Sequence, residues 1–596
     1  MAMYVADSED ESEDAFTDVV NGGPFSWCNA LGRRKSLESI LEEAAENAEA
    51  DGAKLNLFDL LCIGIGGTIG SGVFALTGAV LPVAGPGATV SWALAGLTCL
   101  LSAFAYMELS AKLPTRGSCY AFSYHGLGEV WAVLGGCCLT LEYCISGAGV
   151  ARSWSAKFVE LTGMKGLIHW WGKGTFENNT NVVMLRPANY TGNCYTASHC
   201  SVQYAMYRTD DHYFDYAAGA LCLFCTIILM GGTSFGKIFI NGLTLTKVLL
   251  VAAMIVAGFG ATGILEGDIF SSGEQFFPKG PKGVMDGTVL LFFGFIGFDE
   301  VCCMAGKADN PSKVMPRALI GTLIGAVVFS GAAQLALAMM LGDLASSDQE
   351  IHFEEAFKKV GFEKMHLITS YGECILMPVL VLITMLPQSE LTAAMSTDKL
   401  IPSLFRRQSR NGVFVAGTAF IGVVTILVAV FVPFSILWNM ISIGVLVGFQ
   451  LTNASLIATR YGNGGEVRNS QVAKLTYGLL ASTAIAAYPF WIGYCVPYFD
   501  GQPLGSKEYA LAGMSAVAVL VSVGQMIMIY KHETVPGEEG IYEAPLVPFI
   551  PGIAMFLNFV LMAGMTWTDH MYFGIAAGVF LLAYLAYTAR GTKEPQ

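Results

Sequence analysis

The sequence predicts an all-α polytopic membrane protein with about fourteen transmembrane helices, and three observations support this fold class. Of the 596 residues, 54% are hydrophobic and only 13% are charged, which is about half the charged fraction of a soluble domain. Apolar runs of about 20 residues, the length of helix that crosses a bilayer, recur along nearly the whole chain. The 68 glycines suit close contact between helices in lipid.

The chain begins with a segment of a different kind. Residues 1–56 are polar and strongly acidic, without a cleavable signal pattern, and they predict a cytoplasmic N-terminal tail. Residues 7–14 have the composition of a disordered segment, and residues 36–50 are predicted to form an amphipathic helix on the membrane surface. The formal net charge of -14 owes much to this tail, so it carries no inference about substrate.

The apolar spans fall into three groups. The predicted spans are 57–80, 89–111, 131–155, 216–232, 239–264, 284–304, 318–341, 367–390, 413–432, 435–459, 475–495, 508–530, 546–566 and 571–589. We expect residues 57–264 to form a first five-helix repeat, residues 284–459 a second, and residues 475–589 four additional helices.

The orientation follows from Lys and Arg residues, which concentrate in the short loops on the N-terminal side and so predict that both termini are cytoplasmic. A long loop, residues 156–215, is then external and carries two N-glycosylation sequons, at Asn178 and Asn189. Cys194 and Cys200 in the same polar loop are predicted to form a disulfide in an oxidising compartment. The expected location is the plasma membrane, with a vacuolar or lysosomal membrane as the alternative.

Two predicted spans contain glycine-rich interruptions. In the first, IGIGGTIGSGVF at residues 63–74, five glycines fall within nine residues, although each costs a helix about 1 kcal/mol relative to alanine. The second, FFGFIGFDE at residues 292–300, lies in the sixth span. Because the interruptions open two successive groups of five spans, they predict a 5+5 inverted repeat with paired discontinuous helices at the midplane.

Unwinding of both helices would explain the glycines functionally. It frees backbone groups that are tolerated in a membrane only where they line a cavity. Freed N–H groups beside a half-helix N-terminus bind a carboxylate, and freed carbonyl groups bind an ammonium group. Together they would bind the backbone of an α-amino acid. The alternative is that the glycines only permit tight contact between helices.

With these motifs the chain resembles the amino acid–polyamine–organocation transporters, and within them the cationic amino acid transporter subfamily of solute carrier family 7. The resemblance runs from about residue 55 to 590. The segments that carry it are IGIGGTIGSGVFALTG (63–78), ELSAKLPTRGSCYAFSY (108–124), LEYCISGAGVARSWS (141–155), GFIGFDEV (294–301), DNPSKVMP (309–316), LWNMISIGVLVGFQLTNASLIATRY (437–461) and PLVPFIPGIAMFLN (545–558).

The resemblance implies a LeuT-like fold and alternating-access transport of amino acids, most often arginine, lysine or ornithine. It also implies a substrate site at the two interruptions and in the third span. The predicted substrate-binding residues are Ile65, Gly66, Gly67, Thr68, Gly70, Ser71, Gly72, Glu142, Phe295, Ile296 and Phe298.

Two ionisable residues inside predicted spans have specific expected roles, because charged groups at mid-bilayer are costly and mark a pathway. Family members with the LEY motif place its glutamate, here Glu142, beside the substrate side chain, where it would pair with guanidinium or ammonium. A structural glutamate is the alternative. Some bacterial relatives carry a lysine near the position of Lys247, and there its protonation couples transport to protons. The alternative for Lys247 is snorkelling to water.

Other positions are assigned more conservatively. Phe295, Ile296 and Phe298 flank the sixth-helix break, where aromatic residues often gate the family's site, but plain packing explains them equally well. We expect Asp299 and Glu300 to hold the break open or to face the cytoplasmic vestibule rather than to touch substrate.

The chain also departs from the family near the inner ends of its helices. Lys307 stands where many relatives have an acidic residue, and Glu390 stands where the family usually has arginine. An exchange of both partners would preserve an inner ion pair with swapped signs. Glu108 matches a family position that we interpret as a member of a structural ion pair.

The leading function is therefore a secondary transporter of cationic amino acids, either influenced by protons or acting as a facilitator. The alternatives are a neutral or broad-range amino acid transporter, and an amino acid sensor with little flux that signals through the acidic tail. An enzyme is not expected, since no nucleophile–base constellation or phosphate-binding loop stands out, and neither a cofactor nor a metal is predicted. The expected partners are the amino acid substrate, protons and membrane lipid, but no nucleic acid; a single-helix accessory subunit is left undetermined.

Overall fold

The computed structural model describes residues 33–50, 54–164, 168–170, 213–231, 233–347, 349–409, 413–432, 434–462, 470–535, 537 and 540–589. Its main helices are α3 (Leu37–Ala50), α4 (Leu57–Ser71), α7 (Ala88–Lys112), α8 (Cys119–Gly126), α9 (Glu129–Thr162), α10 (Tyr216–Met230), α11 (Thr233–Gly260), α13 (Gly280–Leu291), α14 (Phe298–Cys303), α15 (Pro311–Leu341), α16 (Phe353–Lys359), α17 (Glu363–Thr397), α18 (Val415–Phe431), α19 (Phe434–Tyr461), α20 (Ser470–Phe490), α22 (Ser506–Tyr530), α23 (Phe549–Ala563) and α24 (Trp567–Ala589).

The described part of the chain contains ten helices that are long and apolar enough to cross a membrane. Three shorter apolar helices, α10, α18 and α23, add to them, and α13 and α14 form the two halves of an interrupted helix. The prediction of an all-α polytopic membrane protein is confirmed, and these segments agree with the fourteen predicted spans. The exact limits of the two repeats and of the C-terminal group stay a prediction.

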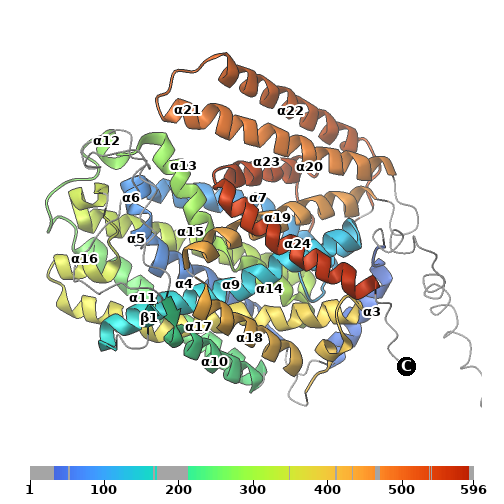
Figure 1. Cartoon of the computed structure of the whole chain (residues 1–596), viewed down its shortest axis with the longest axis horizontal. Helices are drawn as coiled ribbons and strands as arrows, with labels where there is room; N and C mark the ends of the chain where they lie inside the picture. Colours follow the sequence, from blue (N-terminus) through green and yellow to red (C-terminus); the bar gives the residue numbers. More distant parts are fainter. Residues whose placement is uncertain are drawn as a thin grey trace, which may run out of the picture.

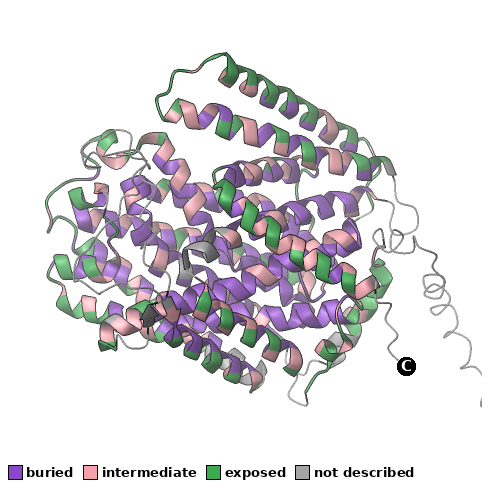
Figure 2. Cartoon of the chain, viewed as in Figure 1, coloured by how far each residue is buried: buried purple, intermediate pink, exposed green. Residues whose placement is uncertain are grey.

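The buried share of each apolar helix distinguishes central helices from peripheral ones. The most apolar windows of Leu57–Ala79, Glu129–Val159 and Met440–Tyr461 are 82%, 83% and 89% buried within the protein, whereas that of Trp567–Thr588 is 6% buried. Figure 2 shows the same gradient, with buried residues in the middle of the bundle and exposed ones on α22 and α24. The exposed residues of α22 include Val517 and Leu520, which suits a surface in contact with lipid.

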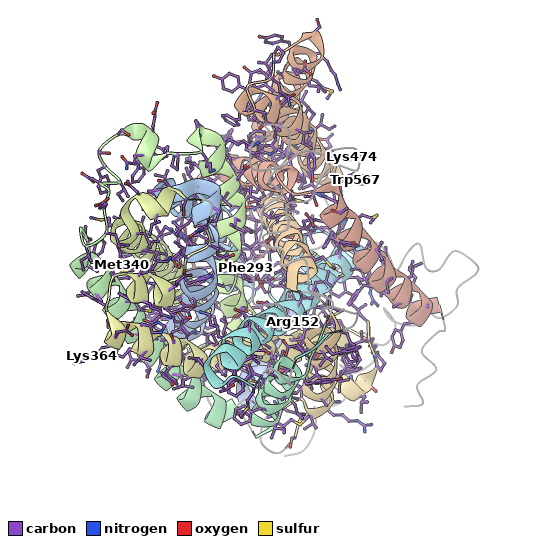
Figure 3. All side chains as sticks on the ribbon, turned by 60° about the vertical axis from the view of Figure 1, so that its left-hand side comes forward. Arg152, Phe293, Met340, Lys364, Lys474 and Trp567 are labelled. Carbon is purple, nitrogen blue, oxygen red and sulfur yellow. The ribbon has the colours of Figure 1, made fainter. Side chains whose placement is uncertain are left out.

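The central helices bring together segments that are far apart in the sequence. α4 contacts α11, α14, α15 and α17, and α9 contacts α17 and α19. In Figure 1, α4, α9 and α14 lie in the middle of the bundle, while α20 and α22 lie side by side at its edge. Figure 3 shows Phe293, from the interrupted helix, inside the bundle, whereas Lys364 and Trp567 lie at its periphery. The two glycine-rich interruptions therefore meet in the interior.

A short antiparallel ladder marks where the predicted external loop leaves and rejoins the helices. Strand β1 (Ile168–Trp170) pairs with β2 (Tyr213–Asp215), and Asp215 caps α10 by accepting a hydrogen bond from the Ala218 N–H. The predicted disulfide, Cys194 with Cys200, and the predicted glycosylation sites, Asn178 and Asn189, lie outside the described residues.

The predicted amphipathic segment near the N-terminus is a helix, α3, which is held against the bundle. Ile40 is fully buried, Lys35 Nζ lies 2.7 Å from Asp398 Oδ1, and Arg33 Nε lies 2.8 Å from Glu129 Oε2. These contacts attach the segment before the first span to the end of α17 and to the start of α9.

Candidate functional site

The glycine run at residues 63–74 folds as a regular helix over most of its length. α4 continues to Ser71 and is followed by η1, a five-residue π-helical turn at Gly72–Leu76. The prediction of an unwound first helix is therefore wrong for this structure. A regular helix keeps its backbone groups paired, as the membrane interior demands, and the remaining irregularity is a π-turn, a feature that is frequent at functional sites.

Close contact between helices explains the glycines of α4. A β-carbon added to Gly64 would lie 2.3 Å from Thr322 Oγ1 of α15, and one added to Gly66 would lie 2.6 Å from Thr244 Oγ1 of α11. Both distances are far below van der Waals contact. The alternative interpretation, that glycine permits tight helix contact, accounts for these positions in this conformation.

The two interruptions touch through their backbones. A β-carbon added to Gly67 would lie 3.3 Å from the Gly297 Cα, and one added to Gly297 would lie 3.2 Å from the Gly67 Cα. Gly297 also has φ of +119°, a conformation that side chains other than glycine rarely adopt. Both residues are therefore required by geometry where α4 crosses the sixth-span break.

The sixth span is interrupted as predicted. After α13 the chain makes a 3-10 turn, η5 (Phe292–Phe295), Ile296 is extended with ψ of 133°, and α14 begins at Phe298. Asp299 and Glu300 lie in the first turn of α14, where the helix dipole favours negative charge. This geometry fits the expectation that the two carboxylates support the break.

Three carboxyl groups gather beside this break. Glu142 of α9 and Asp299 and Glu300 of α14 are each 1% exposed, so the expectation that Asp299 or Glu300 faces a vestibule is wrong. The Glu142 and Asp299 carboxyl groups are neighbours. Glu142 Oε1, Asp299 Oδ1 and Glu300 Oε2 receive no hydrogen bond from an N–H or O–H group of the described residues.

Lys247 of α11 reaches the same stretch of α4 as Glu300 does. Its side chain is fully buried, and Nζ donates a 2.6 Å hydrogen bond to the Gly66 carbonyl oxygen. A β-carbon on Gly70 would lie 2.8 Å from Nζ. Snorkelling is therefore wrong for Lys247, because its ammonium group ends inside the protein against the glycine face of α4. Its predicted role in proton coupling stays a prediction.

The aromatic residues at the break point to different neighbours. Phe295 packs edge-on against Trp92 of α7 at 5.5 Å between ring centroids, and Trp92 also lies 3.0 Å from the position of a β-carbon on Gly72. Phe298 instead packs against Tyr106 and Phe449, at 5.6 and 5.3 Å. Phe295 is thus linked through Trp92 to Gly72, just after the C-terminal end of α4. Phe298 instead belongs to an aromatic cluster with Tyr106 and Phe449.

The remaining predicted substrate-binding residues make local or helix–helix contacts, or lie outside the described side chains. Thr68 Oγ1 donates to the Gly64 carbonyl oxygen at 3.0 Å, Ile65 Cδ1 lies against Gly325 of α15, and the Ile296 N–H donates to the Phe293 carbonyl oxygen. The Ser71 side chain lies outside the described part of the structure. Substrate binding by all these residues stays a prediction.

Trp92 and Thr244, which contact the glycine helix, were not predicted from the sequence. Each stands in an ordinary apolar span without an unusual neighbour. Only the tertiary contacts bring Trp92 to Gly72 and Thr244 to Gly66.

Lys307 and Glu390, the two residues that depart from the family's usual pattern, form an ion pair at the inner ends of the helices. Lys307 Nζ lies 2.6 Å from Glu390 Oε1, and Arg116 Nε lies 3.1 Å from Glu390 Oε2. The Lys307–Glu390 pair with swapped signs is therefore confirmed. The ion-pair role of Glu108 is confirmed as well, since Arg460 NH2 lies 2.6 Å from its Oε2 and Lys112 Nζ lies 2.9 Å from its Oε1.

Comparisons with known proteins agree with this arrangement. Residues 55–507 match the model of a family described as amino acid permease, and residues 542–592 match a model described as the C-terminus of that permease. The chain is 26% identical to cationic amino acid transporter 1 of Arabidopsis thaliana, over 94% of this chain and 86% of the relative.

Two bacterial relatives are also similar. The chain is 32% identical to the methylthioribose transporter of Bacillus subtilis (strain 168), over 72% of this chain and 86% of the relative. It is 28% identical to the branched-chain amino acid permease of the same organism, over 72% of this chain and 85% of the relative.

Proposed function

The chain belongs to the amino acid permease family, and on this premise we propose that it is a secondary transporter that moves cationic amino acids by alternating access. Its place in this family makes it a multi-pass membrane permease of amino acids rather than an enzyme. Arginine, lysine and ornithine are the proposed substrates.

One observation carries the preference for cations: three carboxyl groups, of Glu142, Asp299 and Glu300, are buried together, and Lys247 is the buried cation beside them in the described part of the chain. Burying uncompensated charge is costly. A guanidinium or ammonium group on the substrate would supply donors to carboxylate oxygens that lack them in the described structure. Glu142 is the proposed partner of that group.

The backbone of the substrate would bind where α4 meets the sixth-span break. Neighbouring side chains lie against the glycines of α4 in this conformation, so substrate entry requires these helices to separate. Separation and closure of helices around a central site is the motion of alternating access. The π-turn at Gly72–Leu76 and the short α14 are the proposed places where the backbone changes shape.

Lys247 is the proposed coupling residue. Its ammonium group is bonded to the carbonyl of Gly66, next to the predicted substrate residues Gly67 and Gly70, so protonation there would affect the same helix that binds substrate. The proposed location is the plasma membrane. The Lys and Arg distribution supports the proposal that both termini are cytoplasmic.

A neutral or broad-range amino acid transporter is the second candidate. It is favoured by the similarity to a branched-chain amino acid permease, whose name indicates apolar substrates. An amino acid sensor with little flux is the third, and measurements of flux separate it from both transporters.

The test uses the purified full-length protein in proteoliposomes, with a panel of labelled cationic and neutral amino acids and imposed pH and voltage gradients. We expect accumulation of arginine, lysine or ornithine above the level in protein-free liposomes. Accumulation of neutral amino acids alone would support the second candidate. Substrate binding without uptake would support the sensor and contradict the transport proposal.

A further inference from the structure

Glu300 and Lys247 approach the same short stretch of α4 from different helices. Lys247 Nζ, from α11, donates to the Gly66 carbonyl oxygen at 2.6 Å. Glu300 Oε2, from α14, lies 3.3 Å from the position of a β-carbon on Gly67. Both side chains are at least 99% buried. The absence of side chains at Gly66 and Gly67 leaves only bare backbone beside the two charged groups.

The electrostatic relation between the two residues is mutual. Lys247 and Glu300 carry opposite charges and lie against the adjacent glycines Gly66 and Gly67, although no ion pair within 4.0 Å joins them in the described structure. Glu300 Oε2 also receives no hydrogen bond from the described residues. Because both side chains are buried, solvent screens the attraction between them little.

We propose that Glu300 is the positioning residue that favours the protonated form of Lys247, so that the coupling site is a lysine–glutamate pair across α4 rather than Lys247 alone. This inference rests on the proposed proton coupling and adds a residue to it. In the protonated state the ammonium charge is balanced by the Glu300 carboxylate. When Lys247 gives up its proton to the side on which substrate is released, the amine keeps its lone pair and Glu300 remains anionic.

The other titratable groups around the pair do not replace Glu300. Asp299 precedes Glu300 on α14, and its carboxyl group neighbours that of Glu142 of α9. Cys303, one turn along α14, donates to or accepts from Tyr143. Glu300 is the carboxylate that lies against Gly67, next to the Gly66 carbonyl to which Lys247 donates.

The test compares the pH profile of uptake in proteoliposomes for wild type, Lys247→Met, Glu300→Gln and Glu300→Asp. We expect Lys247→Met to lose the stimulation of uptake by external acid. We expect Glu300→Gln to keep it but to move its midpoint to more acidic pH, because the ammonium form has lost its counter-charge. Glu300→Asp should return the midpoint toward that of wild type. Asp299→Asn, the matched neutralisation on the same helix, should leave the midpoint in place even if it lowers uptake.

An unchanged midpoint in Glu300→Gln, or a shift to more alkaline pH, would overturn the proposal. If wild-type uptake does not depend on pH, the proton coupling of the proposed function fails. The pair is then tested by thermal unfolding of the substrate-free protein. A double variant, Lys247→Met with Glu300→Gln, should lose less stability than the two single losses added together. Strict additivity would contradict the pair.

Discussion

Glu142 is the residue whose role distinguishes the proposed substrate classes. It lies buried in the middle of α9 with its carboxyl group against Asp299. Glu142→Gln removes the charge that would pair with a guanidinium or ammonium group. Truncating one partner of a buried charge pair costs about 2–5 kcal/mol, which raises Kd by about 30-fold or more. We expect this loss for arginine and lysine in equilibrium binding to the purified protein.

Alanine binding by the same variant is the internal control. Alanine shares the backbone of arginine but carries no side-chain charge, so its Kd should change much less. Equal losses for alanine and arginine would assign Glu142 a structural role instead.

Glu390 is the centre of the second residue-scale prediction. It is nearly buried and lies between Lys307 and Arg116. Glu390→Gln leaves two cations without a counter-charge in a site with little solvent, and the loss of one partner from a buried pair costs about 3–5 kcal/mol. We expect a clearly lower thermal unfolding temperature in detergent.

The matched control for Glu390 is Glu355→Gln. Glu355 also faces a lysine, Lys359, at 3.3 Å, but its side chain is 51% exposed. Exposed pairs of this kind contribute at most about 0.5 kcal/mol, so this variant should unfold with the wild type. If both glutamine variants unfold alike, Glu390 does not hold the inner ends of the helices together.

At the scale of the helix, the sequence predicted one interruption correctly and the other incorrectly. In the sixth span, Gly297 is followed by two acidic residues that start a new helix, Asp299 and Glu300, and this combination marks a break. In the first span, glycines alone give no such signal. The demand for close contact with Thr322 and Thr244 produces the same sequence pattern as unwinding does, and only the tertiary structure separates the two explanations.

The crossing of α4 with the sixth-span break gives a prediction at the same scale. A methyl group on Gly67 would lie 3.3 Å from the Gly297 Cα, and backbone cannot move aside as a flexible side chain can. Gly67→Ala should therefore destabilise the protein by about 1–3 kcal/mol, the usual cost of overpacking, and weaken substrate binding. Thermal unfolding and equilibrium binding measure the two effects.

Gly242→Ala is the control for Gly67→Ala. Gly242 lies in α11, with no atom within 4 Å of an added β-carbon. Alanine there should be neutral or stabilising by up to about 1 kcal/mol. A Gly67→Ala protein as stable as Gly242→Ala would show that the crossing of the two helices adjusts freely.

For the whole molecule, hydropathy was sufficient to predict a polytopic all-α protein, and the family resemblance implied the LeuT-like class; this fold class is confirmed. Long apolar spans can be predicted from sequence because lipid permits few alternatives to a helix. The residues that make up the site were harder to predict. Glu142 and Lys247 were identified as charges within apolar spans, whereas Glu300 and Trp92 acquire their positions only when α14 and α7 reach α4.

The driving force for transport is a property of the whole molecule, and a variant of Lys247 tests it. Lys247→Met keeps the length and bulk of the side chain but cannot carry a proton. If protonation of Lys247 drives the cycle, this variant should retain some substrate binding while it loses both the pH dependence of uptake and any accumulation driven by a proton gradient. Uptake into proteoliposomes under separately imposed pH and voltage gradients measures each contribution.

The competing mechanism is a facilitator in which the cationic substrate moves down the membrane potential alone. The potential supplies about 2.3 kcal/mol per charge for each 100 mV, which is enough to concentrate a cation without protons. Wild type would then respond to voltage and hardly to pH, and Lys247→Met would behave in the same way. Since Lys247 also bonds the Gly66 carbonyl, binding of labelled arginine at zero potential must be measured in parallel. A variant that has lost both binding and uptake would indicate that Lys247 supports α4. If wild-type uptake depends on pH, intact binding in Lys247→Met with voltage-driven but pH-independent uptake would identify Lys247 as the proton-coupling residue.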